Sequence, residues 1–304
     1  MRVLITGGNG FIGRHVVRRV IDLGYHPIII GRHPPVLEDK CEFIEADLLL
    51  KPDYNSIMRI AQATHLIHLA WYAEHEYYLE SPINFNWVSA TVDLVEAFAK
   101  NGGQRIVFGG TCAEYDRRHG YLVEDVTPSN PSSIYGVAKN ATMQLTNLQC
   151  RSYGVSYAWA RIFFPFGLGE KENRLVPTLI KIFDQRLPLV EIACDAYRDF
   201  MAVQDLADGL CELLSNNIEG LVNLCSGEPI RISQIIKEIA GSMGVSAIPL
   251  LEFSKNKIPE FQMIVGDSSL MRKAGWTPKV KISDALYTAV KSTVLLPIDQ
   301  THQK

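Results

Sequence analysis

The chain has 304 residues, of which 47% are hydrophobic and 21% are charged. This is the balance of a globular protein, and it excludes an intrinsically disordered chain or a coiled coil. The 30 Lys and Arg residues face 33 Asp and Glu residues, so the chain has no basic surplus for gripping nucleic acid. No apolar run approaches the roughly 18 residues of a membrane span, and no secretory leader pattern opens the sequence. We therefore expect a cytoplasmic protein.

Short β-rich runs alternate with helical stretches in the first half of the chain. We expect strands at residues 2–6, 27–31, 42–48, 64–70, 105–111 and 155–164. Several are continuous apolar runs, which is typical of strands buried on both faces of a parallel sheet. Helices are expected at residues 12–23, 53–62, 85–100 and 133–153. This alternation predicts an α/β fold with a doubly wound, Rossmann-like parallel sheet.

The alternation changes after about residue 164, where Gly and Pro residues cluster. Short strands are expected at 198–203 and 220–225, returning to the sheet. Further helices are expected at residues 176–185, 232–243, 268–274 and 282–293. We therefore expect a Rossmann domain at 1–164, to which 199–225 returns, and a smaller mixed α/β substrate lobe at 165–198 and 226–304.

Residues 6–13, TGGNGFIG, follow the first expected strand and open the first expected helix. Glycines at this turn let backbone N–H groups approach a pyrophosphate, with the positive end of the helix dipole behind them. In this strand–turn–helix context the pattern predicts a dinucleotide site, and an ordinary glycine-rich loop is the alternative. The residues expected to contact the dinucleotide are Thr6, Gly7, Gly10, Phe11, Ile12 and Gly13.

The second expected strand ends in Gly31 and Arg32, without the carboxylate that would hold the ribose 2′-hydroxyl of NAD. Arg32 is suited to a 2′-phosphate, so we expect NADPH as the coenzyme, with NAD as the alternative. Residues at the ends of the next two strands are expected along the coenzyme: Asp47 and Leu48 by the adenine, and Leu69, Ala70 and Trp71 by the nicotinamide.

Tyr135 and Lys139 lie four residues apart in an expected helix, which places both on one face. A neighbouring ammonium lowers the pKa of a phenol, which is near 10 in free tyrosine. Thr111 ends the fifth strand at the carboxyl edge of the sheet, where open α/β sheets bind their ligands. These three residues are the expected catalytic group. Tyr287 and Lys291 share the spacing but have no strand-end Ser or Thr upstream, so we expect a helix surface there.

The cysteines and one pair of histidines are the remaining candidates for a metal site. The six cysteines are scattered without a Cys-x-x-Cys pair, so we expect reduced, mostly buried thiols and no zinc site. His65 and His68 are spaced like a ligand pair, but they lie on an expected strand without an acidic partner. We expect packed histidines and no metal.

Three features together resemble the extended short-chain dehydrogenase/reductases. They are TGGNGFIG, the Thr111…Tyr135-x-x-x-Lys139 arrangement and RDFMAVQDLADG at 198–209. More narrowly, the chain resembles the NAD-dependent epimerase/dehydratase family of nucleotide-sugar enzymes, from residue 2 to about residue 290. The resemblance implies that Arg198 binds the pyrophosphate of the nucleotide sugar and that Arg174 borders the nucleotide. A structural ion pair of Arg198 with Asp199 or Asp205 is the alternative. The resemblance also implies a homodimer through the helices at 85–100 and 133–153.

The sequence departs from the family at the carboxyl ends of two strands. Phe164 stands where many epimerases have Asn, and Cys112 and Ala113 stand where sugar dehydratases have Asp and Glu. GDP-fucose synthase has a Cys and a His where this chain has Ala113 and Gly169. With these groups set aside, the chain most resembles the 4-keto-6-deoxy-sugar reductases, a group that includes proteins similar to CDP-abequose synthase.

We therefore expect NADPH-dependent reduction of the 4-keto group of a nucleotide-activated 6-deoxy sugar. Tyr135 would protonate the oxygen, Lys139 would hold the coenzyme ribose, and Thr111 would orient the carbonyl. The alternatives are an NAD-dependent nucleotide-sugar C4 epimerase and, from another class, a non-catalytic NADP-binding sensor. Sensors typically lose the Tyr or the Lys, and this chain keeps both.

Overall fold

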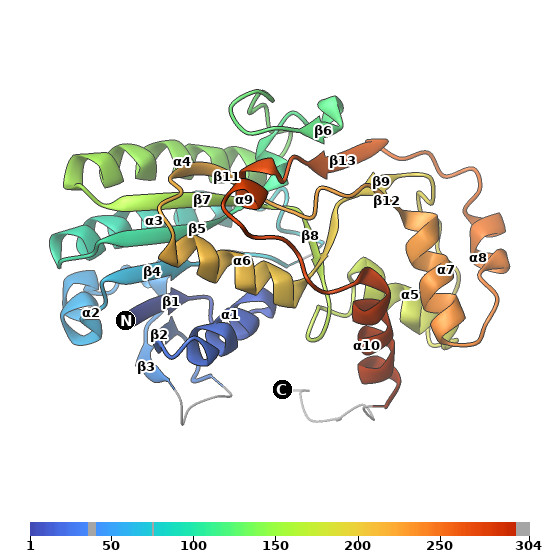
Figure 1. The fold of residues 1–304 in the computed structure, drawn as a ribbon, viewed down its shortest axis with the longest axis horizontal. Helices are drawn as coiled ribbons and strands as arrows, with labels where there is room; N and C mark the ends of the chain where they lie inside the picture. The colour runs from blue at the N-terminus through green and yellow to red at the C-terminus, as the bar shows by residue number, and fades with distance from the viewer. Residues whose placement is uncertain (36–40, 75, 296–304) are drawn as a thin grey trace.

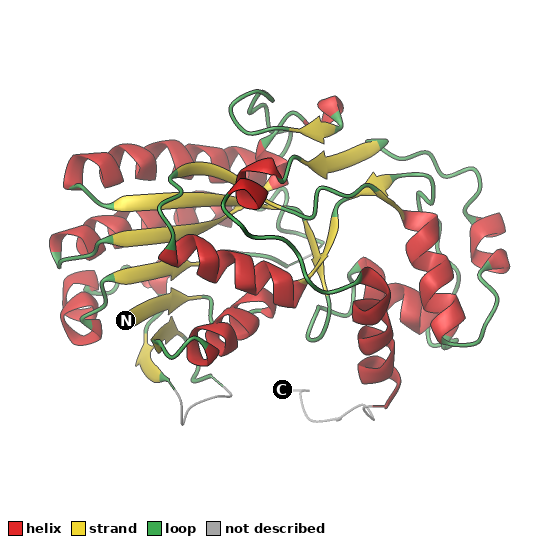
Figure 2. Cartoon of the chain, in the orientation of Figure 1, coloured by secondary structure: helices red, strands yellow, loops and turns green. Residues whose placement is uncertain are grey.

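The computed structural model describes residues 1–35, 41–74 and 76–295. Residues 296–304, the end of the expected second lobe, lie outside this range. A seven-stranded sheet occupies the larger half of the molecule, and each neighbouring pair of its strands is parallel (Figure 1, Figure 2). In spatial order the strands are β11 (Gly220–Leu224), β7 (Ser156–Ile162), β5 (Arg105–Thr111), β4 (His65–His68), β1 (Arg2–Thr6), β2 (His26–Gly31) and β3 (Glu42–Glu45).

Helices cover both faces of this sheet. One face carries α1 (Phe11–Asp22) and α6 (Val203–Ser215), and the other carries α2 (Tyr54–Ala61), α3 (Ile83–Lys100) and α4 (Ile134–Tyr153). The period-two alternation of a strand separates the two cores: in β1, Val3 and Ile5 pack with α1 and α6, whereas Leu4 packs with α2 and α3. The predicted doubly wound sheet is confirmed. Its strand order reverses between β1 and β4, so their carboxyl ends border the ligand crevice of such folds.

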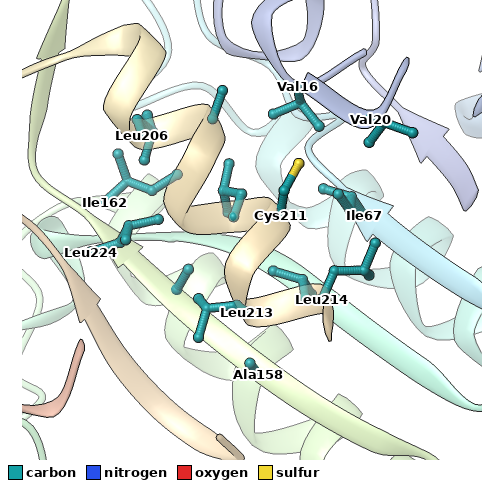
Figure 3. Close-up of a cluster of buried hydrophobic side chains, with 14 of the residues drawn as sticks. Val16, Val20, Ile67, Ala158, Ile162, Leu206, Cys211, Leu213, Leu214 and Leu224 are labelled. Atoms are coloured by element: carbon teal, nitrogen blue, oxygen red, sulfur yellow. The ribbon is translucent and has the colours of Figure 1, made fainter. Parts of the chain in front are cut away.

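Helix α6 packs across the sheet through an apolar stripe (Figure 3). Leu206, Leu213 and Leu214 on this helix are all buried, and they lie among side chains of α1, β4 and β7. Each such leucine contributes roughly 1.5–3 kcal/mol by leaving water. The helix therefore fixes a segment from the second half of the chain onto the sheet.

A smaller mixed α/β lobe stands beside the carboxyl edge of the sheet (Figure 1). It contains two short sheets and a helical layer with its own apolar core. One sheet pairs β8 (Phe164–Phe166) with β10 (Phe200–Ala202), and the other has the order β12 (Ile230–Arg231), β9 (Tyr197–Arg198), β13 (Met263–Gly266), β6 (Tyr121–Leu122). The helices are α5 (Leu175–Phe183), α7 (Ile232–Ser242), α8 (Ile248–Phe253) and α10 (Ile282–Leu295), while α9 (Ser269–Lys273) lies near β11.

Three expectations about these strands are corrected. The strand expected at 198–203 does not join the large sheet: it divides at Asp199 into β9 and β10, whose partners lie in the small sheets. At Asp199 the backbone changes partners, since its N–H donates to the Ile264 carbonyl and its own carbonyl accepts from Phe164. Its side chain is fully buried and accepts hydrogen bonds from Ser226 and from the Gly227 N–H group. The strand expected at 155–164 likewise divides into β7 and β8. The segment between the helices expected at 232–243 and 268–274, where no strand was expected, contains β13.

Within the described ranges, no helix is long and apolar enough to cross a bilayer. The six cysteines are all free, and five of them are buried.

Candidate active site

The turn between β1 and α1 is closed too tightly for side chains. Gly7 has a φ of +72°, and a Cβ atom on Gly13 would lie 1.9 Å from the carbonyl oxygen of Gly7. Gly10 caps α1 without a side-chain hydrogen bond, so the N–H groups of Phe11 and Ile12 have no partner within the helix. A helix end with exposed donors and no acidic residue in its first turn attracts an anion. This cradle fits the pyrophosphate of a dinucleotide.

Thr6 faces the interior rather than the open side of this turn. Its side chain is fully buried, and its hydroxyl accepts the N–H groups of Leu69 at 3.2 Å and Ala70 at 3.1 Å. The same hydroxyl lies 2.8 Å from Nδ1 of His68. Burial and the charge of Lys139 lower the pKa of His68 to about 3, so this histidine is neutral. Thr6 therefore joins the ends of β1 and β4 and supports the turn from behind.

The two residues expected at the adenine serve local structure. Asp47 accepts the Leu49 N–H group at 2.9 Å and caps the short turn that follows β3. Leu48 is buried in the core under α2. By contrast, Arg32 is exposed at the end of β2, and Asn9 of the glycine turn donates to the carbonyl of His33 at 2.6 Å. Arg32 therefore lies on a segment that the glycine turn holds in place.

Lys139 is buried at the carboxyl edge. Its ammonium donates to the carbonyl of Gly109 at 2.7 Å and lies 3.9 Å from the centre of the Trp71 ring. Trp71 is held in turn, since its indole N–H donates to Asn84 at 2.7 Å and its ring stacks on Trp87. Burial lowers the pKa of Lys139 to about 7. An ammonium has three donors, so two remain for a ligand.

Tyr135 and Thr111 are brought together in front of this lysine. Burial is the largest influence on the Tyr135 pKa and raises it, Tyr78 adds to the increase, and a hydrogen bond from Thr111 opposes it. This direction is opposite to the one expected from the Tyr-x-x-x-Lys spacing, because burial outweighs any effect of the ammonium. The Tyr78 ring packs edge-on against Tyr135 with 4.9 Å between centroids. A phenol with a raised pKa keeps its proton at neutral pH and acts as an acid.

A buried carboxylate that the sequence analysis did not single out fixes Thr111. Glu114 is fully buried and accepts the Thr111 N–H group at 2.8 Å, the Trp159 indole N–H at 3.0 Å and the Arg161 guanidinium at 2.8 Å. Arg161 is only 1% exposed and also donates to Ser129. The signal was present, since Thr-x-x-Glu is the capping-box pattern, and the box forms here.

The carboxylate that binds Thr111 is not free to act on a ligand. Both oxygens of Glu114 are occupied by the donors named above. Cys112 is buried, and burial raises the pKa of its thiol to about 12, so it remains neutral. Thr111 itself accepts the Ala113 N–H group at 3.2 Å, which leaves its own O–H free to donate toward Tyr135.

The two arginines implied for the substrate lobe belong to different elements, the start of α5 and strand β9. Arg198 is half-buried and donates to the carbonyls of Tyr197 at 2.7 Å and Phe261 at 3.0 Å. The carboxylates of Asp199 and Asp205 are both occupied by other donors, so the alternative ion pair is not the arrangement found. Arg174 begins α5 with its guanidinium 3.9 Å from Glu170.

Comparison with known proteins connects this geometry to a family. The model of the NAD dependent epimerase/dehydratase family matches residues 3–225. A dTDP-6-deoxy-L-talose 4-dehydrogenase (NAD(+)) from Aggregatibacter actinomycetemcomitans is 26% identical, over 82% of this chain and 93% of its own. A UDP-glucose 4-epimerase from Neisseria meningitidis serogroup B is also 26% identical, over 90% of this chain and 92% of its own. The solved structure of a UDP-glucose 4-epimerase from Thermus thermophilus, in complex with NAD, has the same fold, with a TM-score of 0.83. It is 22% identical, and the match covers 97% of this chain and 99% of that one.

The Glu114–Arg161 pair generates a stability prediction. Arg161→Met leaves a carboxylate buried without its cation, which should reduce the free energy of unfolding by about 3–5 kcal/mol. The double variant Glu114→Gln/Arg161→Met removes both charges and should recover part of this loss. Urea unfolding measures both. Lys255→Ala, which removes an exposed ion pair with Glu252, is the control and should change little. Equal effects of the Arg161 and Lys255 variants would contradict the assigned role.

Proposed function

We propose that this chain, which belongs to the NAD-dependent epimerase/dehydratase family, reduces the 4-keto group of a nucleotide-activated 6-deoxy sugar with NADPH. The observation that carries the proposal is the composition of the carboxyl edge. A proton-holding Thr111–Tyr135 pair lies beside a buried lysine, and the carboxylate that binds Thr111, that of Glu114, is already bound to Arg161.

This composition suits the delivery of one proton. Dehydration of a sugar requires a further acid and base to remove a proton and expel water from neighbouring carbons. Cys112 is a neutral thiol with a pKa of about 12, and Glu114 is fully buried in its ion pair. A carbonyl reduction needs only a hydride and a proton, and Tyr135 holds the proton.

A bound nicotinamide coenzyme supplies the hydride. The Tyr135 hydroxyl donates its proton to the carbonyl oxygen, so C=O becomes CH–OH. The Thr111 hydroxyl, which donates toward Tyr135, then stabilises the phenolate that remains. The two donors of Lys139 that Gly109 leaves free would hold the coenzyme ribose. The glycine turn with Phe11 and Ile12 would bind the pyrophosphate.

A relative supports the sugar chemistry. The enzyme from A. actinomycetemcomitans is by name a 4-dehydrogenase of a dTDP-linked 6-deoxy sugar. The reverse of a 4-dehydrogenation is the reduction of a 4-keto group, which is the reaction proposed here. Its name also gives NAD(+), so the coenzyme of this chain rests on Arg32 and not on that relative.

A nucleotide-sugar C4 epimerase is the second candidate, because several relatives are named UDP-glucose 4-epimerase. An epimerase removes a hydride and returns it to the same carbon, with the same tyrosine acting as base and then as acid. An epimerase therefore retains one coenzyme through many cycles, whereas a reductase consumes one coenzyme for each sugar.

Stoichiometry decides between these candidates. With dTDP-, CDP- or GDP-linked 4-keto-6-deoxy sugars, one NADPH should disappear per sugar converted, and no deuterium should enter C3 or C5 in heavy water. Absorbance of NADPH and NMR of the product measure both. Sugar interconversion without loss of coenzyme would support the epimerase instead, and deuterium at C3 or C5 would indicate chemistry that the proposal excludes.

The coenzyme preference is a separate prediction. Arg32 is exposed, makes no ion pair in the described part of the chain, and follows a strand that ends in Gly31 where NAD enzymes of this fold carry an acid. NADPH should therefore bind more tightly than NADH. The double change Gly31→Asp with Arg32→Ala should narrow or reverse that difference, as measured by the two dissociation constants. Equal affinities in the unaltered protein would refute the preference.

The role of Tyr135 can be tested with a matched control. Tyr135→Phe removes the proton donor and keeps the ring, and loss of general acid catalysis typically lowers turnover by about 10²–10⁴-fold. Binding of NADPH should change little. Tyr287→Phe alters the other Tyr-x-x-x-Lys pair, which is an exposed cation–π contact on α10, and should be nearly silent. Near-normal turnover of the Tyr135 variant would remove this residue from the mechanism.

We also propose a homodimer in a reducing, cytoplasmic compartment. Large apolar side chains are exposed along α3 and α4, among them Phe85, Val137, Leu145 and Leu148, and pairing of these helices with a second copy would cover them. Sedimentation velocity should give twice the mass of the chain, and a monomer would contradict the pairing. The six free thiols support the reducing compartment.

A further inference from the structure

Two guanidinium groups converge on one residue of the substrate lobe. The Arg117 guanidinium lies 4.4 Å from the centre of the Phe261 ring, and Arg198 donates to the Phe261 carbonyl at 3.0 Å. Arg117 begins a short 3₁₀ turn six residues after Thr111, and it also donates to Ser132 at 3.2 Å. It therefore joins the loop after β5, the start of α4 and the segment that enters β13.

The charges of both arginines reach the residue that follows Thr111. Arg117 and Arg198 each oppose the effect of burial on the pKa of Cys112, the immediate neighbour of Thr111. Burial lowers the pKa of Arg198, and the positive charge of Arg117 adds to that lowering. Arg117, Arg198 and Phe261 thus form one corner of the substrate lobe, and its positive charge reaches the Cys112 thiol.

This corner has little negative charge of its own to compensate. Among the described residues, neither Arg117 nor Arg198 forms an ion pair, whereas the adjacent Arg118 pairs with Asp116. Asp199 is close, but it is buried and bound by backbone N–H groups and Ser226, and the charge of Glu260 is a minor influence on Arg198. Two half-buried like charges repel each other. Such an arrangement becomes favourable when a ligand supplies the negative charge.

We infer that Arg117 acts with Arg198 to bind the diphosphate of the nucleotide-sugar substrate. The inference rests on the proposed function, which supplies a doubly charged group next to the sugar. A guanidinium stacked on an aromatic ring keeps its edge N–H donors free for phosphate oxygens. With two such groups at one corner, each phosphate can receive its own arginine. The sugar would then extend from this corner toward Thr111 and Tyr135.

The experiment compares neighbouring arginines of the same turn. Arg117→Met keeps the apolar stem on Phe261 and removes the charge, Arg117→Lys keeps a charge, and Arg118→Ala is the control. Calorimetry with the coenzyme-saturated protein gives affinities for UDP, dTDP, CDP and GDP, and for the nucleosides that lack the diphosphate. Arg117→Met should weaken binding of the preferred diphosphate about tenfold or more, since a charged hydrogen bond is lost. Arg198→Met should do the same, Arg117→Lys should lose less, and Arg118→Ala should match the unaltered protein.

The outcomes separate this inference from the proposed function. If the protein binds a nucleoside diphosphate and only Arg198→Met weakens that binding, the role of Arg117 is overturned and the function stands. If Arg117→Met weakens nucleoside and diphosphate equally, or lowers the melting temperature while Arg117→Lys does not restore affinity, Arg117 is structural and the inference is also overturned. If the unaltered protein binds none of the four diphosphates, the proposed function fails first.

Discussion

The ion pair between Glu114 and Arg161 is the constraint on which the geometry of the carboxyl edge depends. Both groups are shielded from water, and such a pair contributes little net stability because desolvation of two charges offsets their attraction. What it provides is orientation. Glu114 binds the N–H group of Thr111, and Ala113 donates to the Thr111 hydroxyl oxygen. The Thr111 O–H is thereby left to point at Tyr135.

The same buried carboxylate acts on the neighbouring titratable groups. After burial, which is the largest influence, the negative charge of Glu114 contributes to raising the pKa of Tyr135 and counteracts the lowering of the pKa of Lys139. In both cases it favours the form that holds the proton. A site that must donate a proton to a carbonyl needs this bias. Since Glu114 cannot reach the substrate, it provides the bias without adding a second acid.

Local patterns in the sequence were sufficient for the parts of the site that are local. The glycine turn and the Tyr135–Lys139 pair are each set by a few consecutive residues, so their spacing predicted their structure. The spacing did not predict burial, which is why the expected direction of the Tyr135 pKa was wrong. Contacts between distant segments, such as Lys139 with Trp71 or Arg161 with Glu114, leave no periodic signal. Short strands such as β6 and β13 share this property, because each exists only through its partner.

The proposed catalytic group of Thr111, Tyr135 and Lys139 cannot by itself separate a reductase from an epimerase, since the same group would suit a hydride moving in either direction. The difference must lie in how the coenzyme is held. At the expected adenosine end, Asn9, Arg32 and His33 are all exposed, whereas Lys139 at the nicotinamide end is buried. A charge-based contact at an exposed arginine is screened by salt and readily broken. A coenzyme anchored there can exchange at each turnover, which net reduction requires and epimerisation does not.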